Sequence, residues 1–240
     1  MNDARVLWIT GGGSGMGAAS ARAAARDGWT VVLSGRRADR LAEVATAIRD
    51  DGGTADVLPL DANDPEAVTA TRDSLLAQYG RLDGLVLAAG LNRPARRWDD
   101  QSLPDFRAIV DTNLTAVVTV VDAALPALRE SGGIVVVVSS YAGWSFQPGA
   151  GVAYSASKTA LGSVVRTLNQ QEAGHGVRAT HLCPGDVATD FLDQRPSVPD
   201  AAARAVMLQP EDIARSVSFV LEAPSHMRVD ELVVSPVSQR

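Results

Sequence analysis

The sequence has little of several residue types, and each scarcity excludes a class of protein. Its 240 residues contain one cysteine, Cys183, so the chain has no internal disulfide, which is typical of proteins in a reducing cytoplasm. The three histidines, His175, His181 and His226, are scattered, and no His or Cys cluster shows metal-ligand spacing. We therefore expect neither a disulfide framework nor a catalytic metal.

Positive charge and long apolar runs are scarce as well. The formal net charge is −6, which disfavours contact with nucleic-acid phosphates. The longest apolar runs, such as Ile134 to Val138, are too short to span a membrane, and the first residues lack the features of a signal peptide. We expect a soluble cytoplasmic protein with no nucleic acid or membrane partner. Any phosphate-bearing ligand would then have to be bound by local groups at its site, because the overall charge of the protein does not attract it.

Short apolar runs alternate with longer segments of helical character along the whole chain. Apolar runs that do not alternate with polar residues are typical of a parallel sheet covered on both faces. The sequence therefore predicts one domain, residues 1–240, with the α/β fold of a Rossmann-type, doubly wound parallel sheet of about seven strands and helices on both faces. The expected strands are Val6–Thr10, Thr30–Ser34, Ala55–Pro59, Gly84–Ala88, Gly133–Ser139, Val177–Leu182 and Glu231–Val234, and the expected helices are Met16–Asp27, Arg40–Asp50, Pro65–Tyr79, Phe106–Arg129, Ala153–Glu172 and Glu211–Glu222.

One loose stretch follows the sixth expected strand. Asp193 to Ala203 contains two prolines and has no strand character, so it reads as a loop leading into a short helix. Because ligands bind at the carboxyl ends of strands in such sheets, residues 188–210 are a candidate substrate lid. An ordinary surface connection is the alternative.

A glycine-rich turn lies between the first expected strand and the first expected helix, from Thr10 to Gly17. Glycines there allow the backbone to approach a pyrophosphate, and the helix N-terminus offers free N–H groups to its charge. The position within a strand–helix unit predicts dinucleotide binding more strongly than the glycines alone.

The Thr-Gly-x-x-x-Gly-x-Gly pattern resembles the short-chain dehydrogenase/reductase family, and the resemblance continues in order down the chain. Further motifs are Asp61 after the third strand, Ala89-Gly90 after the fourth, Asn113 before the fifth, Ser139-Ser140 at its end, Tyr154 and Lys158 in the next helix, and Pro184 to Thr189 after the sixth. The resemblance implies a dinucleotide-binding set of Gly11, Ser14, Gly15, Met16, Gly17, Arg36, Arg37, Asp61, Ala62, Ala89, Gly90, Tyr154, Lys158, Pro184, Gly185, Val187 and Thr189.

Tyr154 and Lys158 are four residues apart and so share one face of the expected helix. A nearby lysine cation favours the phenolate and lowers the pKa of a tyrosine, which makes it a better acid/base at neutral pH. The resemblance further implies that Lys158 holds the nicotinamide ribose, that Ser140 bonds the substrate oxygen, and that Asn113 holds a water that links Lys158 to solvent. The catalytic set is therefore Asn113, Ser140, Tyr154 and Lys158.

The chain departs from the family pattern at three places. Ser140 and Tyr154 are fourteen residues apart, one more than usual, and we place the extra residue in the glycine-rich loop 148–153. The usual Asn-Asn-Ala-Gly reads Leu87-Ala88-Ala89-Gly90, which removes a stabilising feature. The ending from Glu231 to Val237 resembles a subgroup that includes bacterial 3-hydroxy acid dehydrogenases.

The end of the second expected strand predicts the nicotinamide cofactor. Where NAD-preferring members place an acidic residue this chain has Gly35, followed by Arg36 and Arg37. Arg36 can pair with a 2′-phosphate and stack on adenine. NADP(H) is therefore favoured, with NAD(H) as the alternative.

Aromatic residues are few, at 5% of the chain, yet several follow the expected catalytic strand ends. We expect Tyr141, Trp144, Phe146 and Phe191 to line the substrate pocket, which favours a substrate with an apolar body. The alternative is a substrate with a carboxylate, which the arginines after Gly90 could bind, although loop arginines are usually solvated; these include Arg93, Arg96 and Arg97. Packing is the alternative role for Trp144.

The sequence as a whole predicts an oxidoreductase that interconverts an alcohol and a carbonyl. Two alternatives remain open: an epimerase or dehydratase on the same fold, and a dinucleotide-binding sensor without turnover. The resemblance also implies a homo-oligomer, a tetramer or dimer packed through the long helices at 106–129 and 153–172.

Overall fold

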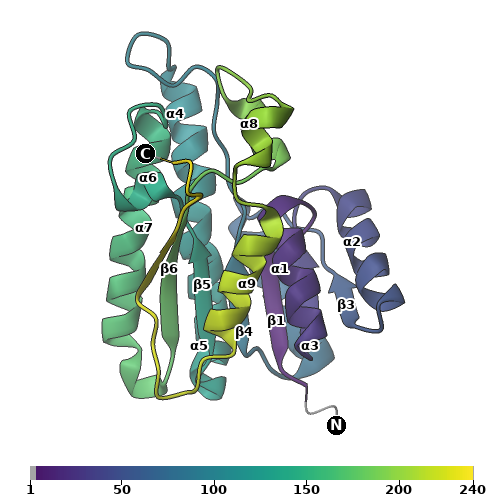
Figure 1. Cartoon of the computed structure of the whole chain (residues 1–240). Coiled ribbons are helices and arrows are strands. Elements are labelled where there is room, and N and C mark those ends of the chain that lie inside the picture. Colours follow the sequence, from purple (N-terminus) through teal and green to yellow (C-terminus); the bar gives the residue numbers. More distant parts are fainter. Residues whose placement is uncertain (1–3, 240) are drawn as a thin grey trace.

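The computed structural model describes residues 4–239 and has one seven-stranded parallel sheet with helices on both faces (Figure 1). The strand order is β3-β2-β1-β4-β5-β6-β7. The predicted fold class is confirmed, and the strand positions differ from the prediction by at most two residues at an end. The strands are β1 (Val6–Thr10), β2 (Thr30–Ser34), β3 (Thr54–Val57), β4 (Gly84–Leu87), β5 (Ile134–Val138), β6 (Arg178–Pro184) and β7 (Glu231–Val234).

The apolar strands are buried on both faces because alternate side chains enter different cores. In β1, Leu7 and Ile9 pack under α1 (Gly15–Arg26), α2 (Ala38–Asp50) and α9 (Pro210–Leu221). Val6 and Trp8 pack on the other side, under α3 (Pro65–Tyr79), α5 (Ala116–Ser131) and α7 (Val152–Gln171). This is the two-sided burial that continuous apolar runs predict.

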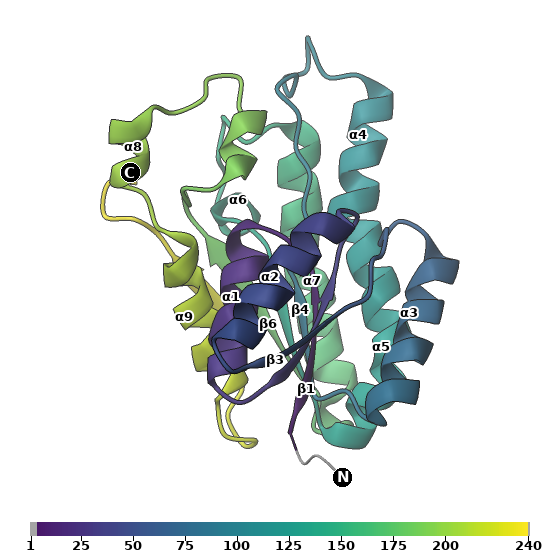
Figure 2. The same cartoon turned by 90° about the vertical axis from the view of Figure 1, so that its right-hand side faces the viewer.

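The direction of the strand order changes between β1 and β4. From β1 the chain continues outward to β2 and β3, whereas β4 and the later strands extend the sheet on the other side. Loops that leave the carboxyl ends of β1 and β4 therefore separate and leave a crevice for ligands. Beyond this edge lie α4 (Leu103–Val110), α6 (Tyr141–Trp144) and α8 (Ala201–Ala205), at the top of Figures 1 and 2, together with the short turn η3 (Asp190–Gln194).

The helix predicted at 106–129 is longer and less regular than expected. It runs from Leu103 to Ser131 as α4, a π-helical turn η1 (Asp111–Thr115) and α5. By length and composition alone this stretch could cross a membrane, a test that core helices of soluble proteins also pass. Its buried side chains pack against the sheet, as those of a core helix do. A last short turn, η2 (Ala173–His175), precedes β6.

Candidate active site

A cavity of about 940 Å³ lies at the carboxyl edge of the sheet, where the strand order changes. All seventeen residues predicted to bind a dinucleotide line it, Tyr154 and Lys158 among them, and so does Ser140. Sequence reasoning did not assign several other lining residues, among them the polar residues Ser34, Asn63, Asn92, Asp186, Asp190, Gln194, Arg195, Ser197 and Gln239.

The glycine loop after β1 has no room for side chains. A Cβ on Gly17 would collide with the carbonyl oxygen of Gly11, and a Cβ on Gly11 would lie 2.6 Å from the Ala89 nitrogen. Gly11 also has a φ of +69°, a conformation that favours glycine. The loop thus brings bare backbone to the cavity, as the approach of a pyrophosphate requires.

The N-terminus of α1 faces this loop with its first N–H groups uncapped. Ser14 occupies the N-cap position, yet its side chain makes no capping hydrogen bond and instead accepts one from Arg37 Nη2 at 3.0 Å. Free N–H groups and the helix dipole together form a site for an anion. The residues present therefore suit a dinucleotide, as the sequence predicts.

The residues that the sequence predicts to select between cofactors lie at one end of the cavity, which we call the adenosine end. Gly35, Arg36 and Arg37 follow β2 and line the cavity, and both arginines are exposed. On the opposite wall Asp61 accepts two hydrogen bonds from Asn63, which hold its carboxylate in place. Positive charge thus lies where NAD-preferring sites have an acid.

Tyr154 and Lys158 lie one turn apart on α7 and both reach the cavity. Lys158 is 3% exposed, and its Nζ donates to the Val138 carbonyl at 3.1 Å and lies 5.8 Å from the centre of the Tyr154 ring. Gly90 borders this amine, because a Cβ there would be 4.0 Å from Lys158 Nζ. The predicted shared face is therefore present, with the lysine behind the tyrosine ring.

Burial, rather than the charge of Lys158, is the largest cause of the pKa shift at Tyr154. Burial raises the pKa of Tyr154, and a hydrogen bond with Ser140 and the charges of Arg195 and Arg96 oppose that rise. Lys158 is not among the groups that lower the pKa of Tyr154, and burial lowers the pKa of its own amine to about 8. The expected lowering of the tyrosine pKa by Lys158 is thus corrected for the protein without cofactor.

Ser140 lines the cavity and forms a hydrogen bond with Tyr154. It is the N-cap of α6, and its Oγ accepts from the Ala142 N–H at 3.2 Å, which fixes the hydroxyl at the cavity wall. The loop between α6 and α7 absorbs the long spacing from Ser140 to Tyr154, with Gly151 at a φ of +95°. Ser140 therefore takes the position that the sequence predicted for it.

Asn113 lies behind the cavity wall and does not line the cavity. It is fully buried in the π-helical turn, where its amide exchanges two hydrogen bonds with the Leu91 backbone and donates to Ser157 Oγ at 3.3 Å. These bonds engage its side chain, so a water relay at this position would use the main-chain carbonyl. Turns of this kind recur at functional sites.

Only two of the four aromatic residues predicted for the substrate pocket line the cavity. Phe191 packs beside Tyr154 with ring centres 6.0 Å apart, and Tyr141 opens α6. Trp144 and Phe146 are outside the lining and 50% and 80% exposed, because the short helix α6 carries the chain away from the cavity after Tyr141. The structure therefore does not place Trp144 and Phe146 in the wall of the cavity where the sequence expects the substrate.

Three loops meet over the substrate end of the cavity through residues that sequence motifs do not identify. Asn92 donates to the Ala150 carbonyl at 3.1 Å, and its own N–H donates to Gln194 Oε1 at 2.8 Å. Arg96, 6% exposed, bonds carbonyls in the same loops. These bonds connect the candidate lid to the loop after β4. Asn92 and Gln194 gave no signal in the sequence because they belong to no motif.

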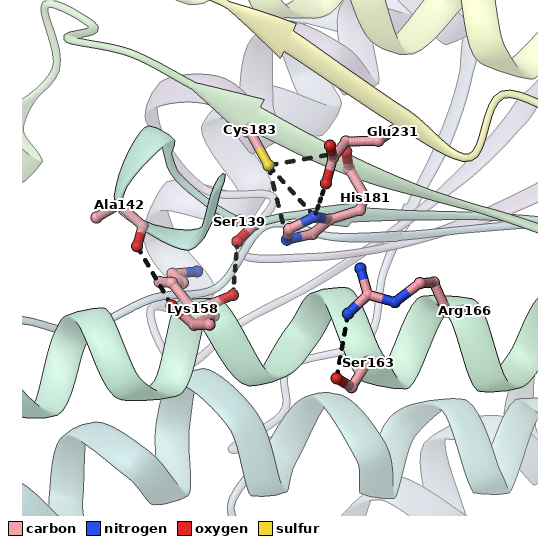
Figure 3. Close-up of polar contacts among 9 residues, drawn as sticks. Ser139, Ala142, Lys158, Ser163, Arg166, His181, Cys183 and Glu231 are labelled. Carbon is pink, nitrogen blue, oxygen red and sulfur yellow. Dashed lines mark hydrogen bonds and ion pairs between the residues drawn. The ribbon is translucent and has the colours of Figure 1, made fainter. Parts of the chain in front are cut away.

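A second polar cluster lies behind the site, on β6 and β7 (Figure 3). The parallel register places Glu231 opposite His181, whose Nδ1 is 3.0 Å from Glu231 Oε2, and Cys183 completes a trio whose ligand atoms lie within 4.8 Å. The expectation that no His and Cys residues cluster is thereby corrected. Cys183 Sγ is 3.4 and 3.6 Å from the two ring nitrogens and so lies over the ring, and burial raises the pKa of the thiol to about 12. A neutral thiol stacked on a ring is not arranged as a metal ligand.

Comparison with known proteins agrees with this geometry. Residues 5–199 match the profile of the short chain dehydrogenase family. The chain is 35% identical to sulfoacetaldehyde reductase 2 of Chromohalobacter salexigens, over 98% of this chain and 95% of that protein. It superposes on an alcohol dehydrogenase from the archaeon Thermococcus sibiricus, complexed with 5-hydroxy-NADP, with a TM-score of 0.90, 32% identity and coverage of 99% of each chain.

A serine dehydrogenase in a closed form, complexed with NADP+, is similar as well. Its TM-score is 0.89 at 29% identity, with coverage of 98% of this chain and 96% of the other. The protein therefore belongs to the short-chain dehydrogenase family of oxidoreductases.

Proposed function

We propose that this protein is an NADP(H)-dependent oxidoreductase that interconverts a small alcohol and its carbonyl, with Tyr154 as the acid/base. The carrying observation is that Tyr154, Ser140 and Lys158 open into the same cavity that the glycine loop and Arg36 line. A dinucleotide along this wall would supply or accept the hydride. The residues of the chain then have to orient the substrate and move one proton.

In the reductive direction Tyr154 donates its phenolic proton to the carbonyl oxygen. Burial raises the pKa of Tyr154, so the phenol carries its proton at neutral pH. Ser140 Oγ, fixed at the start of α6, donates to the same oxygen and holds it beside the phenol. The reverse reaction needs the phenolate and is therefore expected to speed up toward alkaline pH.

Lys158 supports this chemistry from behind the tyrosine. Its amine lies in a nearly closed space beside Gly90 and Val138, next to where the family resemblance places the nicotinamide ribose. We assign it to holding the ribose hydroxyls, and assign Asn113 to the relay of the proton through its main-chain carbonyl. Both roles predict that a change at either residue affects the pH profile as well as the rate.

NADP(H) is the favoured cofactor because of the charges after β2. The exposed guanidinium of Arg36 lines the adenosine end, and Gly35 stands where an acid would repel a 2′-phosphate. The solved structures similar to this chain that are complexed with NADP support the same choice.

Arg36→Asp tests this assignment. The variant removes a charge-assisted bond to the 2′-phosphate and adds repulsion, so the ratio of kcat/KM for NADPH over NADH should fall by about tenfold or more. Steady-state rates with each cofactor measure the ratio, with Arg26→Asp, which reverses an exposed charge in the last turn of α1, as the control. An unchanged ratio in Arg36→Asp would remove it as the selector.

The names of two similar proteins indicate a size and polarity for the substrate. Sulfoacetaldehyde carries a sulfonate and serine carries a carboxylate, and both are small. For this chain we propose a small polar alcohol or carbonyl, in place of the bulky aromatic substrate that exposed Trp144 and Phe146 would have suited.

A panel of aldehydes, ketones and alcohols run with both cofactors tests the proposed function. Net oxidation of NADPH with a carbonyl, followed by absorbance, supports the redox reaction. An epimerase or dehydratase would convert its substrate with no net change of cofactor, and a sensor would bind NADPH with no turnover at all. A cytoplasmic location and a homo-oligomeric state remain predictions.

A further inference from the structure

Two arginines stand side by side at the substrate end of the cavity. Arg96 comes from the loop after β4 and Arg195 follows η3 in the candidate lid, and both line the cavity together with Tyr154. The charges of both reach the phenol of Tyr154 and oppose the rise of its pKa. Segments a hundred residues apart therefore bring positive charge to one point beside the reacting group.

Contacts with the backbone fix the position of Arg96. Its guanidinium donates to the carbonyls of Arg93, Gly149 and Gln194, and the last of these belongs to the peptide that joins Gln194 to Arg195. Gly151 makes room for it, because a Cβ there would lie 2.6 Å from Arg96 Cβ. Three of the five guanidinium N–H donors are thereby used, which leaves two for a ligand.

Arg195 is held from the other side. Both terminal nitrogens of its guanidinium bond the carboxylate of Asp186 in the loop after β6, and its side chain is 34% exposed and lines the cavity. The nearby charge of Arg195 lowers the pKa of Arg96, in addition to the larger effect of burial. Two like charges held so close are relieved by an anion between them.

The charged groups that face this end of the cavity leave an excess of positive charge. Of the charged groups that line it, Arg96, Lys158 and Arg195 are the cations, and Asp186 and the exposed Asp190 are the acids, while Asp100 acts on Arg96 from outside the lining. Asp186 is already paired with Arg195, and its effect on the pKa of Tyr154 is smaller than that of either arginine. An uncharged substrate would leave this excess without a partner.

We propose that Arg195 and Arg96 form a subsite for an acid group, a carboxylate or a sulfonate, of a small hydroxy or oxo acid whose carbon–oxygen bond reaches Tyr154. The N–H donors of Arg195 that Asp186 leaves free, together with the two free donors of Arg96, bind the oxygens of the acid group, and Arg96 also holds the backbone that carries Arg195. This inference rests on the proposed redox function and names its substrate class.

Matched pairs of aldehydes test the subsite. Sulfoacetaldehyde and 4-oxobutanoate are compared with propanal and methyl 4-oxobutanoate, which keep the aldehyde and lack the charge. The wild-type protein should reduce the anionic member of each pair with a kcat/KM about tenfold higher or more, since a charged hydrogen bond is worth about that factor.

Arg195→Gln should remove that preference. The expected result is a fall of about tenfold or more in the ratio of kcat/KM for the anionic over the neutral aldehydes, mainly through KM. The ratio is used because Arg195 also acts on the pKa of Tyr154, an effect that both classes of aldehyde share. Arg195→Lys keeps the charge without the fork and should recover part of the loss. Arg166→Gln, which removes an exposed arginine further along α7, should leave the rates for both classes unchanged.

The outcomes separate the subsite from the redox function. Equal rates for anionic and neutral aldehydes, or an equal loss for both in Arg195→Gln, would overturn the subsite while the redox function stands. If no aldehyde is reduced, calorimetry with ethanesulfonate decides: binding that Arg195→Gln abolishes supports the subsite, and the absence of binding rejects it.

Discussion

At the residue scale, the chemistry depends on what burial does to two ionisable groups. Tyr154 keeps its proton at neutral pH because burial raises the pKa of its phenol, whereas Lys158 approaches neutrality because burial lowers the pKa of its amine to about 8. Both shifts disfavour the charged form of the group. Burial of these groups therefore lowers the free energy of unfolding, and a charged ligand bound nearby would change both pKa values. Active sites often combine such costs with function.

Lys158 should therefore leave a signature in the pH dependence of stability. Its pKa is about 8 in the folded protein and ordinarily 10.5, so between these values the unfolded chain binds more protons and the free energy of unfolding rises with pH. From pH 7.5 to 9.5 this contribution is about 2 kcal/mol. Lys158→Met should lack the rise and be more stable at pH 7.5, as measured by urea unfolding without cofactor.

The comparison between the two proteins isolates Lys158. It is the only lysine in the sequence, and Cys183, whose raised pKa acts in the opposite direction above pH 9, is present in both. Parallel curves for wild type and Lys158→Met would contradict the burial of a titrating amine.

Most residues of the cofactor site could be predicted from the sequence because each stands at the end of a strand in a recognisable motif. The substrate end could not, because Arg195 and Gln194 lie in a loop whose path depends on contacts with Arg96 and Asn92. The sequence likewise could not reveal that α6 directs Trp144 and Phe146 away from the cavity. Side-chain direction in short irregular segments is a tertiary property.

At the element scale, the turn from β1 to α1 provides the backbone surface on which we propose that the cofactor pyrophosphate binds. Its glycines leave the backbone bare, and the uncapped start of α1 faces the same space. The strand and helix positions were predictable because their hydrophobic periods are strong. The π-helical turn at Asp111–Thr115 was not, since it depends on the bonds of Asn113 to Leu91.

Gly17→Ala tests the close packing in this turn. Its Cβ would meet the Gly11 carbonyl, which is backbone and cannot yield, so we expect a loss of about 2 kcal/mol or more in stability and strongly weakened NADPH binding. Thermal unfolding and fluorescence titration measure the two effects. Gly174→Ala, with open space around the new Cβ, is the control, and equal behaviour of both variants would refute the packing argument.

At the scale of the whole molecule, the parallel sheet brings distant segments together at one edge. Four segments open on the same cavity because the strand order reverses between β1 and β4: the glycine loop after β1, the loop after β4, Ser140 after β5 and the candidate lid after β6. Fold class follows from the repeating strand–helix pattern, which local mismatches such as the missing Asn-Asn motif do not disturb.

The predicted homo-oligomer is a property at this scale. The family resemblance implies a tetramer or dimer, and the helical stretch Leu103–Ser131 is apolar yet only partly buried within the chain. Sedimentation equilibrium should give a mass of two or four times 25.1 kDa. A mass of one chain at micromolar concentration would contradict the prediction.

The most direct test of the account is Tyr154→Phe, assayed for turnover and for NADPH binding in the same preparation. Turnover of the best carbonyl substrate should fall by about a hundredfold or more, since the variant has no proton to donate, while the Kd for NADPH should change little. Near-normal turnover in Tyr154→Phe would contradict the assignment of Tyr154 as the acid/base and with it the proposed mechanism.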